Sequence, residues 1–238
     1  MAEQSLEERI LGPRTLADWT PPPRPSGPLE GRLVRLEPLA PAQADALHAA
    51  NSADAEGAMW LYMPYGPFAD AGEYRAWVEE VAGRPDPFFY AIVDRVRGPL
   101  GVASFLRVQP AAGSIEVGHI ALSPALQRTP AATEAMALMM AWAFDAGYRR
   151  YEWKCNARNR TSRDAALRLG LSYEGVFRQA TVVKGRNRDT AWYAAIDTEW
   201  PALADAFARW LDPSNFDPEG RQRTSLRALT RPVLVATG

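Results

Sequence analysis

Runs of apolar positions, and the spacing between them, divide the chain into predicted strands and helices. Alternating or continuous β-favouring apolar residues predict strands over residues 32–37, 88–94, 100–108, 114–122 and 151–155, and two more strands flanking the turn Gly185-Arg186-Asn187-Arg188. Apolar residues three and four positions apart predict helices over residues 41–51, 72–82, 130–147, 161–169 and 199–211.

The order of these elements predicts a mixed α/β fold. Three antiparallel strands, a helix, a strand, a helix and a final hairpin favour a central, mostly antiparallel mixed sheet flanked by helices. We expect this domain to span residues 29–211. Residues 1–28 are rich in proline and predict an extended N-terminal arm. Residues 212–238 form a C-terminal tail with Leu226, Leu229, Val233 and Val235 between arginines, and we expect it to pack on the domain or on a second subunit.

Composition narrows the class of protein. The 238 residues are 47% hydrophobic, which is enough for a substantial core, and the net charge of −1 without a long basic run argues against a nucleic-acid surface. Cys155 is the single cysteine, so no intramolecular disulfide forms, and no apolar run approaches the ~20 residues of a membrane span. The first ten residues hold three glutamates and no apolar segment, so we expect no ordinary signal peptide. We therefore expect a cytoplasmic protein, and with only His48 and His119 we expect no metal site.

The most informative segment is the turn at residues 123–135, where a strand leads into a helix. Thr129 followed by Pro130 is the pattern of an N-cap with proline at the first helical position. Free N–H groups and the positive end of a helix dipole bind phosphate oxygens, and Arg128 stands beside them. The spacing alone favours the alternative, an ordinary capped core helix.

Several motifs in order resemble one family. Gln127, Ala132, Thr133, Glu134 and Ala135 match the pyrophosphate-binding turn Q/R-x-x-G-x-G/A and its A-T-E-A continuation in GNAT acetyltransferases of the RimJ/RimL type. Further matches are the N-x-x-S, L-G-F, Y-E-G-x-x-R and K-G-x-x-x-D motifs at Asn159 and Ser162, Leu169 to Leu171, Tyr173 to Arg178, and Lys184 to Asp189. The resemblance covers residues 31–200. Pro130 replaces the central glycine and has no N–H, a loss of about 1.5–3 kcal/mol, or about ten- to a hundredfold in affinity.

The resemblance implies where a cofactor would bind. In GNAT proteins the strands before and after the cofactor helix, here residues 114–122 and 151–155, splay apart and admit the pantetheine of acetyl-CoA. By this resemblance the acetyl-CoA site would contain Ile120, Leu122, Gln127, Arg128, Thr129, Ala131, Ala132, Thr133 and Asn159. A subset of Arg149, Arg150, Arg158, Arg160 and Arg163 could also reach the coenzyme phosphates, although a solvated surface is the plainer interpretation.

Acetyl transfer needs a base for the amine and an acid for the leaving thiolate. Glu116 on strand 114–122 is a candidate base, with a structural carboxylate as the equal alternative. The family's general-acid tyrosine is replaced by Ala166, so Ser162 is the remaining candidate acid, with helix capping as its plainer role. By family position Trp60 and Tyr62 lie beside the acceptor cleft, although aromatic residues of this kind also pack cores.

The sequence thus predicts an acyl-CoA-dependent N-acyltransferase that moves an acetyl group to a primary amine. We expect direct attack, because a lone Cys155 at a strand end does not favour a covalent acyl-enzyme. The acceptor would be a small-molecule amine or a protein N-terminus, and a homodimer is an open alternative for assembly. Two other hypotheses remain: a catalytically silent protein that binds CoA or a partner, and an acyltransferase that uses succinyl-CoA or another donor.

Overall fold

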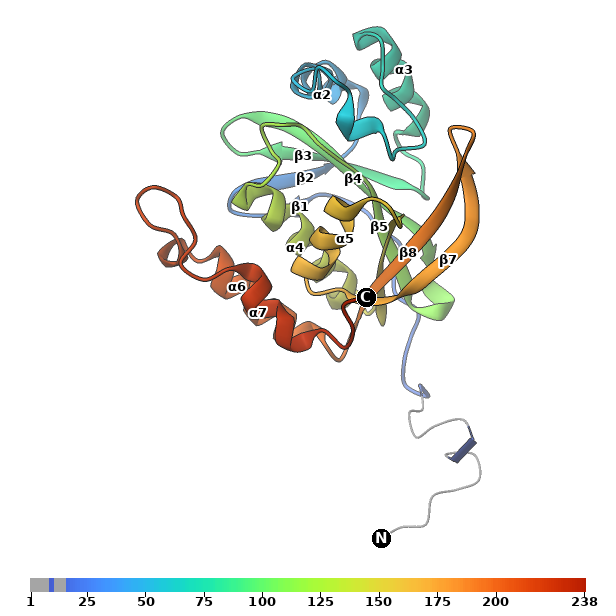
Figure 1. Ribbon diagram of the computed structural model, residues 1–238, viewed down its shortest axis with the longest axis vertical. Coiled ribbons are helices and arrows are strands. Elements are labelled where there is room, and N and C mark those ends of the chain that lie inside the picture. The colour runs from blue at the N-terminus through green and yellow to red at the C-terminus, as the bar shows by residue number, and fades with distance from the viewer. Residues whose placement is uncertain (1–8, 11–15) are drawn as a thin grey trace.

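An eight-stranded sheet runs through the molecule in the order β1-β2-β3-β4-β5-β6-β8-β7 (Figure 1). This computed structural model describes residues 9–10 and 16–238. The strands are β1 Leu29–Glu30, β2 Val34–Pro38, β3 Phe88–Asp94, β4 Gly98–Gln109, β5 Ser114–Leu122, β6 Arg150–Asn156, β7 Ser172–Val183 and β8 Arg186–Ile196. All neighbouring pairs are antiparallel except β5 and β6. The predicted mixed, mostly antiparallel sheet is therefore confirmed.

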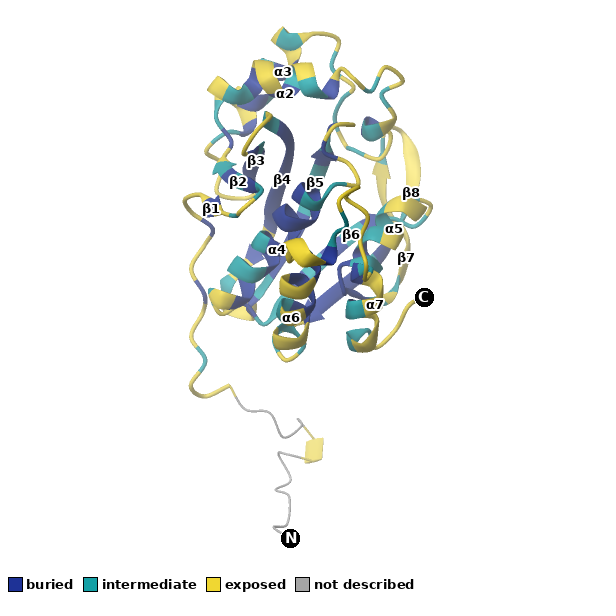
Figure 2. Ribbon diagram, turned by 90° about the vertical axis from the view of Figure 1, so that its left-hand side faces the viewer, coloured by how far each residue is buried: buried dark blue, intermediate teal, exposed yellow. Residues whose placement is uncertain are grey.

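Helices cover both faces of the sheet. The elements α2 Ala44–Asn51 and α3 Ala71–Val81 lie on one face, and α4 Pro130–Asp145, α5 Arg160–Arg168, α6 Trp200–Leu211 and α7 Leu226–Thr230 lie on the other (Figures 1 and 2). Short 3₁₀ turns are η1 Pro41–Gln43, η2 Ala58–Trp60, η3 Pro110–Ala112, η4 Pro213–Asn215 and η5 Arg231–Val233. None of the helices in the described part of the chain is both long and apolar enough to cross a membrane.

Each face has its own hydrophobic cluster. The larger cluster joins Ile115 and Val117 of β5 to Met139 and Phe144 of α4. The smaller cluster packs α2 and α3 onto β3 and β4, with Tyr74 at its centre. Burying each large apolar side chain contributes about 1.5–3 kcal/mol to the stability of the fold. The two clusters therefore stabilise the packing of the helices on both faces of the sheet.

Glu134 fastens α4 to the start of the domain. Its buried carboxylate accepts hydrogen bonds from the backbone N–H groups of Arg32, Leu33 and Val34, at 3.1, 2.6 and 2.8 Å. A buried carboxylate that accepts several backbone donors is well satisfied. The glutamate of the A-T-E-A sequence therefore holds the helix at a fixed position against β2.

The strands β5 and β6 part after a short parallel ladder. Ser114 to Val117 pair with Arg150 to Trp153, and beyond them β5 continues beside β4 alone while β6 continues beside β8. At this point the register of β5 shifts and His119 adopts a left-handed backbone with φ of 51°. The splay that the family resemblance implied is present, and it opens beside the start of α4.

Most predicted elements have the expected bounds, with some differences. The strand at residues 114–122 is confirmed, whereas the helix predicted to reach Gly147 ends at Asp145, and β4 already includes Gly98 and Pro99. The predicted helix from Pro41 is a 3₁₀ turn followed by α2. The sequence did not predict β1, because two residues are too short to show a period.

Both terminal segments lie against the domain. Residues 1–8 and 11–15 of the predicted arm are outside the described residues. Residues 19–28 contain no helix or strand, yet Trp19 donates a hydrogen bond to the Gly147 carbonyl at 3.2 Å, and Tyr148 donates one to Pro23 at 2.9 Å. In the tail, Leu226 and Thr230 are fully buried, and the Tyr173 N–H donates to Ala236. The division at residues 28 and 211 itself stays a prediction.

Candidate active site

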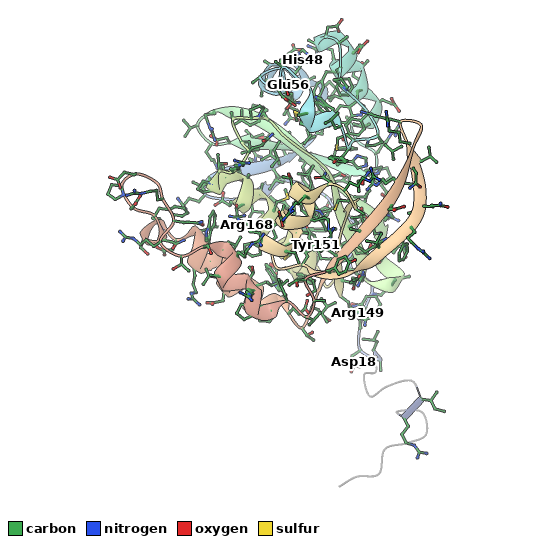
Figure 3. All side chains as sticks on the ribbon, in the orientation of Figure 1. Asp18, His48, Glu56, Arg149, Tyr151 and Arg168 are labelled. Atoms are coloured by element: carbon green, nitrogen blue, oxygen red, sulfur yellow. The ribbon has the colours of Figure 1, made fainter. Side chains whose placement is uncertain are left out.

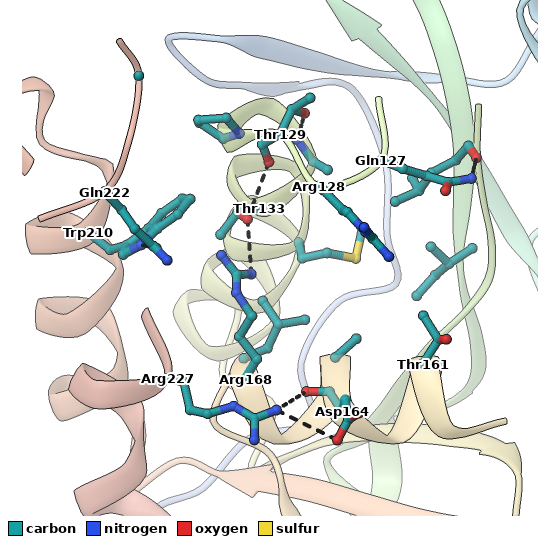
Figure 4. Close-up of a pocket in the computed structure, with 18 of the residues that line it drawn as sticks. Gln127, Arg128, Thr129, Thr133, Thr161, Asp164, Arg168, Trp210, Gln222 and Arg227 are labelled. Carbon is teal, nitrogen blue, oxygen red and sulfur yellow. Dashed lines mark hydrogen bonds and ion pairs between the residues drawn. The ribbon is translucent and has the colours of Figure 1, made fainter. Parts of the chain in front are cut away.

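A cavity of about 790 Å³ opens at the N-terminus of α4. Its walls come from the end of β5, the first turns of α4, one side of α5, and Trp210 of α6 with the loop that follows (Figure 4). A volume in the range of 300–1,000 Å³ is typical of a site for a sizeable ligand. The cavity lies on the α4 face of the sheet, next to the splay.

The turn before α4 has the geometry of an anion site. Thr129 caps the helix by accepting the Ala132 N–H at 3.2 Å, and Pro130 takes the first helical position, as predicted. Arg128 adopts a left-handed backbone with φ of 59°, a strained conformation for a residue with a side chain. Within the described part of the chain, the N–H groups of Arg128 and Ala131 have no hydrogen-bond partner. The positive end of α4 is therefore open toward the cavity.

Arg168 brings a positive charge into the same cavity. Its guanidinium donates a hydrogen bond to the Thr133 hydroxyl at 3.1 Å and lies over the ring of Trp210, 4.9 Å from the centroid. No carboxylate of the described residues pairs with it, and burial together with Arg227 lowers its pKa. Figures 3 and 4 show Arg168 inside the molecule, extending toward the start of α4. A half-buried cation without a counter-charge is suited to bind an anion.

The C-terminal tail supplies a further wall. Gln222 accepts a hydrogen bond from the Trp210 indole at 2.8 Å, and Arg227 lies 3.7 Å from the Asp164 carboxylate (Figure 4). Sequence reasoning missed Arg168, Gln222 and Arg227 as site residues. The alternation of arginine and apolar residues in the tail was the available signal, but it did not indicate this cavity.

The predicted cofactor residues gather at the cavity with two exceptions. Those that line it are Ile120, Leu122, Gln127, Arg128, Thr129, Ala132 and Thr133. Ala131 and Asn159 do not. Asn159 instead caps α5, with its Oδ1 accepting the Ser162 N–H at 3.1 Å. None of the five arginines considered for phosphate contact lines the cavity. Arg150 pairs with glutamates, and Arg163 donates to the Tyr193 hydroxyl at 2.9 Å.

Ser162 is held between two side chains of β6. Its hydroxyl accepts the indole N–H of Trp153 at 2.9 Å and hydrogen-bonds the Cys155 thiol. The helix cap at this place is Asn159, so the capping role weighed for Ser162 is wrong. Burial raises the pKa of Cys155, which keeps its thiol protonated at neutral pH and unsuited to act as a nucleophile.

Glu116 belongs to a charge ladder on the other face of the sheet. It accepts two hydrogen bonds from Arg107, at 2.6 and 2.9 Å, and pairs with Lys154 at 2.9 Å. Lys154 continues to Glu152 at 2.7 Å, and Arg150 joins Glu152 to Glu174 at 2.7 and 2.5 Å. Glu116 and Lys154 are 3% and 5% exposed. The ladder alternates three cations with three anions and is electrically balanced.

His119 stands at the end of this face, where β5 leaves β6. Its ring stacks on Tyr65 with centroids 5.5 Å apart, and its Nδ1 lies 3.3 Å from the Tyr65 hydroxyl. Burial, with the charges of Arg107 and Arg188, lowers the pKa of His119 to about 4. The imidazole is therefore neutral at pH 7. No sequence motif indicated a catalytic role for His119, because its position at the bulge depends on the register shift of β5.

The aromatic loop at residues 58–68 covers this face of the sheet next to His119. Trp60 is 5% exposed and packs edge-on against Phe68, so it serves the core of the loop. Tyr62 is 39% exposed and its hydroxyl reaches the Arg158 carbonyl at 3.4 Å. Lys184, at the tip of the β7–β8 hairpin, donates to the carbonyls of Trp60 and Gly66 at 2.9 and 2.7 Å. Lys184 thus joins the hairpin to the loop, which packs on the face of the sheet opposite the cavity.

These two sides define the chemistry of the site. An open helix start, and an arginine that pairs with no carboxylate of the described residues, suit the phosphates of a coenzyme. The charge ladder, His119 and the aromatic loop lie on the opposite face of the sheet. A mixed, mostly antiparallel sheet with a splay beside an open helix start is the arrangement of the GNAT fold class.

The comparisons agree with this assignment. The model of the acetyltransferase (GNAT) domain matches residues 33–172, so the chain belongs to the GNAT acetyltransferase family and is an N-acetyltransferase of that family. No curated protein matches the sequence significantly.

Solved structures of the same family are similar over most of the chain. A GCN5-related N-acetyltransferase from Brucella melitensis is 44% identical, with a TM-score of 0.87 over 90% of this chain and 99% of that one. A probable GNAT acetyltransferase from Chromobacterium violaceum is 36% identical, with a TM-score of 0.74 over 85% and 98%. RimL, a ribosomal L7/L12 α-N-protein acetyltransferase solved with coenzyme A, is 21% identical, with a TM-score of 0.59 over 71% and 98%, and shares the fold.

Proposed function

We propose that this protein is a cytoplasmic, RimJ/RimL-like N-acetyltransferase that transfers an acetyl group from acetyl-CoA to a primary amine. The observation that carries the proposal is the pairing of the open α4 start with Arg168, whose charge is unpaired among the described residues. An anion of two or more charges would satisfy both. RimL, solved with coenzyme A, supplies the precedent in the same fold.

The cofactor-binding residues divide into two groups by chemistry. Arg128, Arg168 and the free N–H groups before and within the first turn of α4 would hold the phosphates, and Gln222 and Arg227 would border the same end of the ligand. Ile120, Leu122 and Trp153 are apolar and line the part of the cavity nearest the splay, where the pantetheine arm would lie. When bound, acetyl-CoA supplies an activated thioester whose acyl carbon can accept an amine.

The protein's own task is to place the acceptor and to move protons. Direct attack forms the amine–acyl bond, breaks the thioester bond, removes one proton from the amine and returns one to the thiolate. No acyl-enzyme is needed, which agrees with the protonated, buried Cys155. Tyr62, at the exposed edge of the aromatic loop, would contact the acceptor.

Two groups are candidates to receive the amine proton. Glu116 is the sequence-based candidate, but Arg107 and Lys154 already hold its carboxylate, so a water molecule would have to relay the proton. His119 is neutral at pH 7 and stands at the splay with Tyr65 beside it. Ser162 remains the candidate donor to the thiolate, with its hydroxyl oriented by Trp153.

The function is tested by following free CoA with a panel of primary amines and peptides, with the product identified by mass spectrometry. We expect one free thiol for each acetylated amine and no acetylated protein in the absence of acceptor. Binding of acetyl-CoA with no thiol release on any acceptor would contradict the enzymatic assignment.

A further inference from the structure

Arg188 is a surplus positive charge beside the splay. It lies on β8 and pairs with Thr181 of β7, while the pairing of β8 with β6 begins two residues later, at Thr190. Residues of one parity on a strand share a face, so Arg188 shares its face with Thr190 and Trp192. The ring of Trp192 lies 3.6 Å from the Lys154 ammonium. Arg188 therefore faces the same side of the sheet as the charge ladder.

The guanidinium of Arg188 has no partner among the described residues. It forms no ion pair there, and its Nε is buried without a hydrogen bond. Its close charged neighbours are Arg107, Glu116 and the ionisable Cys155. Glu116 is already held by Arg107 and Lys154, so it is not free to neutralise Arg188. A half-buried donor without an acceptor normally meets a ligand or water.

The charge ladder does not neutralise Arg188. Arg107, Lys154 and Arg150 are matched by Glu116, Glu152 and Glu174 along the ladder. Arg188 adds one positive charge that nothing in the ladder offsets. A single planar carboxylate would restore neutrality, and the guanidinium fork matches its geometry.

We infer that Arg188 binds a carboxylate of the acceptor, so that this N-acetyltransferase acts on amines that also carry a carboxylate. This inference rests on the proposed function. The acceptor is favoured over the acyl donor because Arg188 lies on the ladder face, opposite the cavity at the start of α4. It also lies near His119, so the carboxylate and the amine of one acceptor would be held on the same side of the splay.

The test compares amines that differ only in the carboxylate. Each α-amino acid is paired with its amide, and 4-aminobutyrate with butylamine, at saturating acetyl-CoA. We expect the wild type to show a kcat/KM about ten- to a hundredfold higher for at least one carboxylated partner. Arg188→Ala should remove that preference, so that each carboxylated amine and its uncharged partner react with similar kcat/KM. Arg186→Ala, at an exposed position on the same hairpin, should keep it.

A binding measurement gives a readout independent of turnover. Calorimetry of the same amines, titrated into the protein with CoA present, should show a carboxylate-dependent affinity that Arg188→Ala abolishes. A preference that persists in Arg188→Ala, or a wild type that acetylates amines and favours no carboxylated one, would overturn the inference.

Two further substrate comparisons distinguish a carboxylate of the acceptor from other anions that Arg188 could bind. If Arg188→Ala lowers the rate with succinyl-CoA and leaves acceptor preference intact, the anion belongs to the donor and the inference is wrong. A preference for phosphoethanolamine over ethanolamine, with none for carboxylates, would also contradict it. Failure of the proposed function looks different: acetyl-CoA binds, and none of the amines, charged or uncharged, is acetylated.

Discussion

The guanidinium of Arg168 on α5 donates a hydrogen bond to the hydroxyl of Thr133 on α4. This bond joins the two helices across the cavity beside the splay. The bond orients a charge that no described carboxylate neutralises. It also places that charge one turn inside the helix whose N-terminus is open. Both features face one cavity, so a single anionic ligand there would contact both.

Replacing Pro130 should reveal how much the missing N–H costs. Pro130→Gly restores a backbone donor at the first position of α4, and we expect acetyl-CoA to bind about ten- to a hundredfold more tightly. The same change should lower the melting temperature, because glycine loses more conformational freedom on folding. Pro201→Gly, at the start of α6, is the matched control and should lower stability without tightening binding. Equal affinity in wild type and Pro130→Gly would show that no phosphate meets this position.

Glu116→Gln separates a structural role from a catalytic one. Lys154 is nearly fully buried and would lose one of its two carboxylate partners, so we expect a loss of about 3–5 kcal/mol in the free energy of unfolding. Glu174→Gln, at the exposed end of the ladder, should cost about 0–1 kcal/mol. Urea denaturation measures both.

Kinetic measurements on Glu116→Gln test whether Glu116 also takes part in the reaction. If Glu116 also relays the amine proton, kcat should fall while the dissociation constant of acetyl-CoA stays the same. A destabilised variant with an unchanged kcat would restrict Glu116 to the ladder.

His119 predicts a dependence of stability on pH. The pKa of His119 is about 4 in the folded protein, below the ordinary value of 6.5. Between these two pH values the imidazole is protonated in the unfolded chain and neutral in the folded protein. The stabilisation from neutral His119 is complete above pH 6.5 and is lost as the pH falls toward 4. Unfolding of His119→Gln, compared with wild type at pH 7.5 and 5, should show a smaller loss on acidification. Identical losses in the two proteins would contradict the buried, neutral imidazole.

Removing residues 213–238 should affect both the fold and the cavity. Leu226 and Thr230 are fully buried, and Thr230 donates to the Arg168 carbonyl at 3.0 Å. We expect a lower melting temperature and weaker acetyl-CoA binding, because Gln222 and Arg227 line the cavity.

The variant Arg227→Ala separates the effect on the cavity from the effect on the fold. It should weaken acetyl-CoA binding and leave the melting temperature within a few degrees of the wild type. Light scattering of the full-length and truncated proteins tests the homodimer that the sequence left as an open alternative, and unchanged stability, mass and affinity would show the tail to be dispensable.

Local sequence predicted the parts of the site that local chemistry determines. Thr129 and Pro130 fix the start of α4 through capping and proline geometry, and both act within a few residues. The family resemblance, and not local chemistry, assigned Ile120 and Leu122 to the site. The motif resemblance supplied the splay, which periodicity does not show.

The rest of the site depends on contacts between distant segments. In the sequence, Arg168 is an ordinary basic residue in the last turn of a predicted helix. Only the packing of α5 against α4 brings it to Thr133, 35 residues away. Arg227 reaches Asp164 across 63 residues. The isolation of Arg188 likewise depends on which strands are neighbours. No single-sequence period encodes these pairings.

The most direct test of the account is a calorimetric titration of acetyl-CoA into the wild type and Arg168→Ala. Arg160→Ala is the control, because Arg160 is 93% exposed and outside the cavity. We predict one binding site per chain, an affinity about ten- to a hundredfold weaker in Arg168→Ala, and no change in Arg160→Ala. Equal affinity in all three proteins, or no binding to the wild type at millimolar acetyl-CoA, would contradict a coenzyme site between α4 and Arg168.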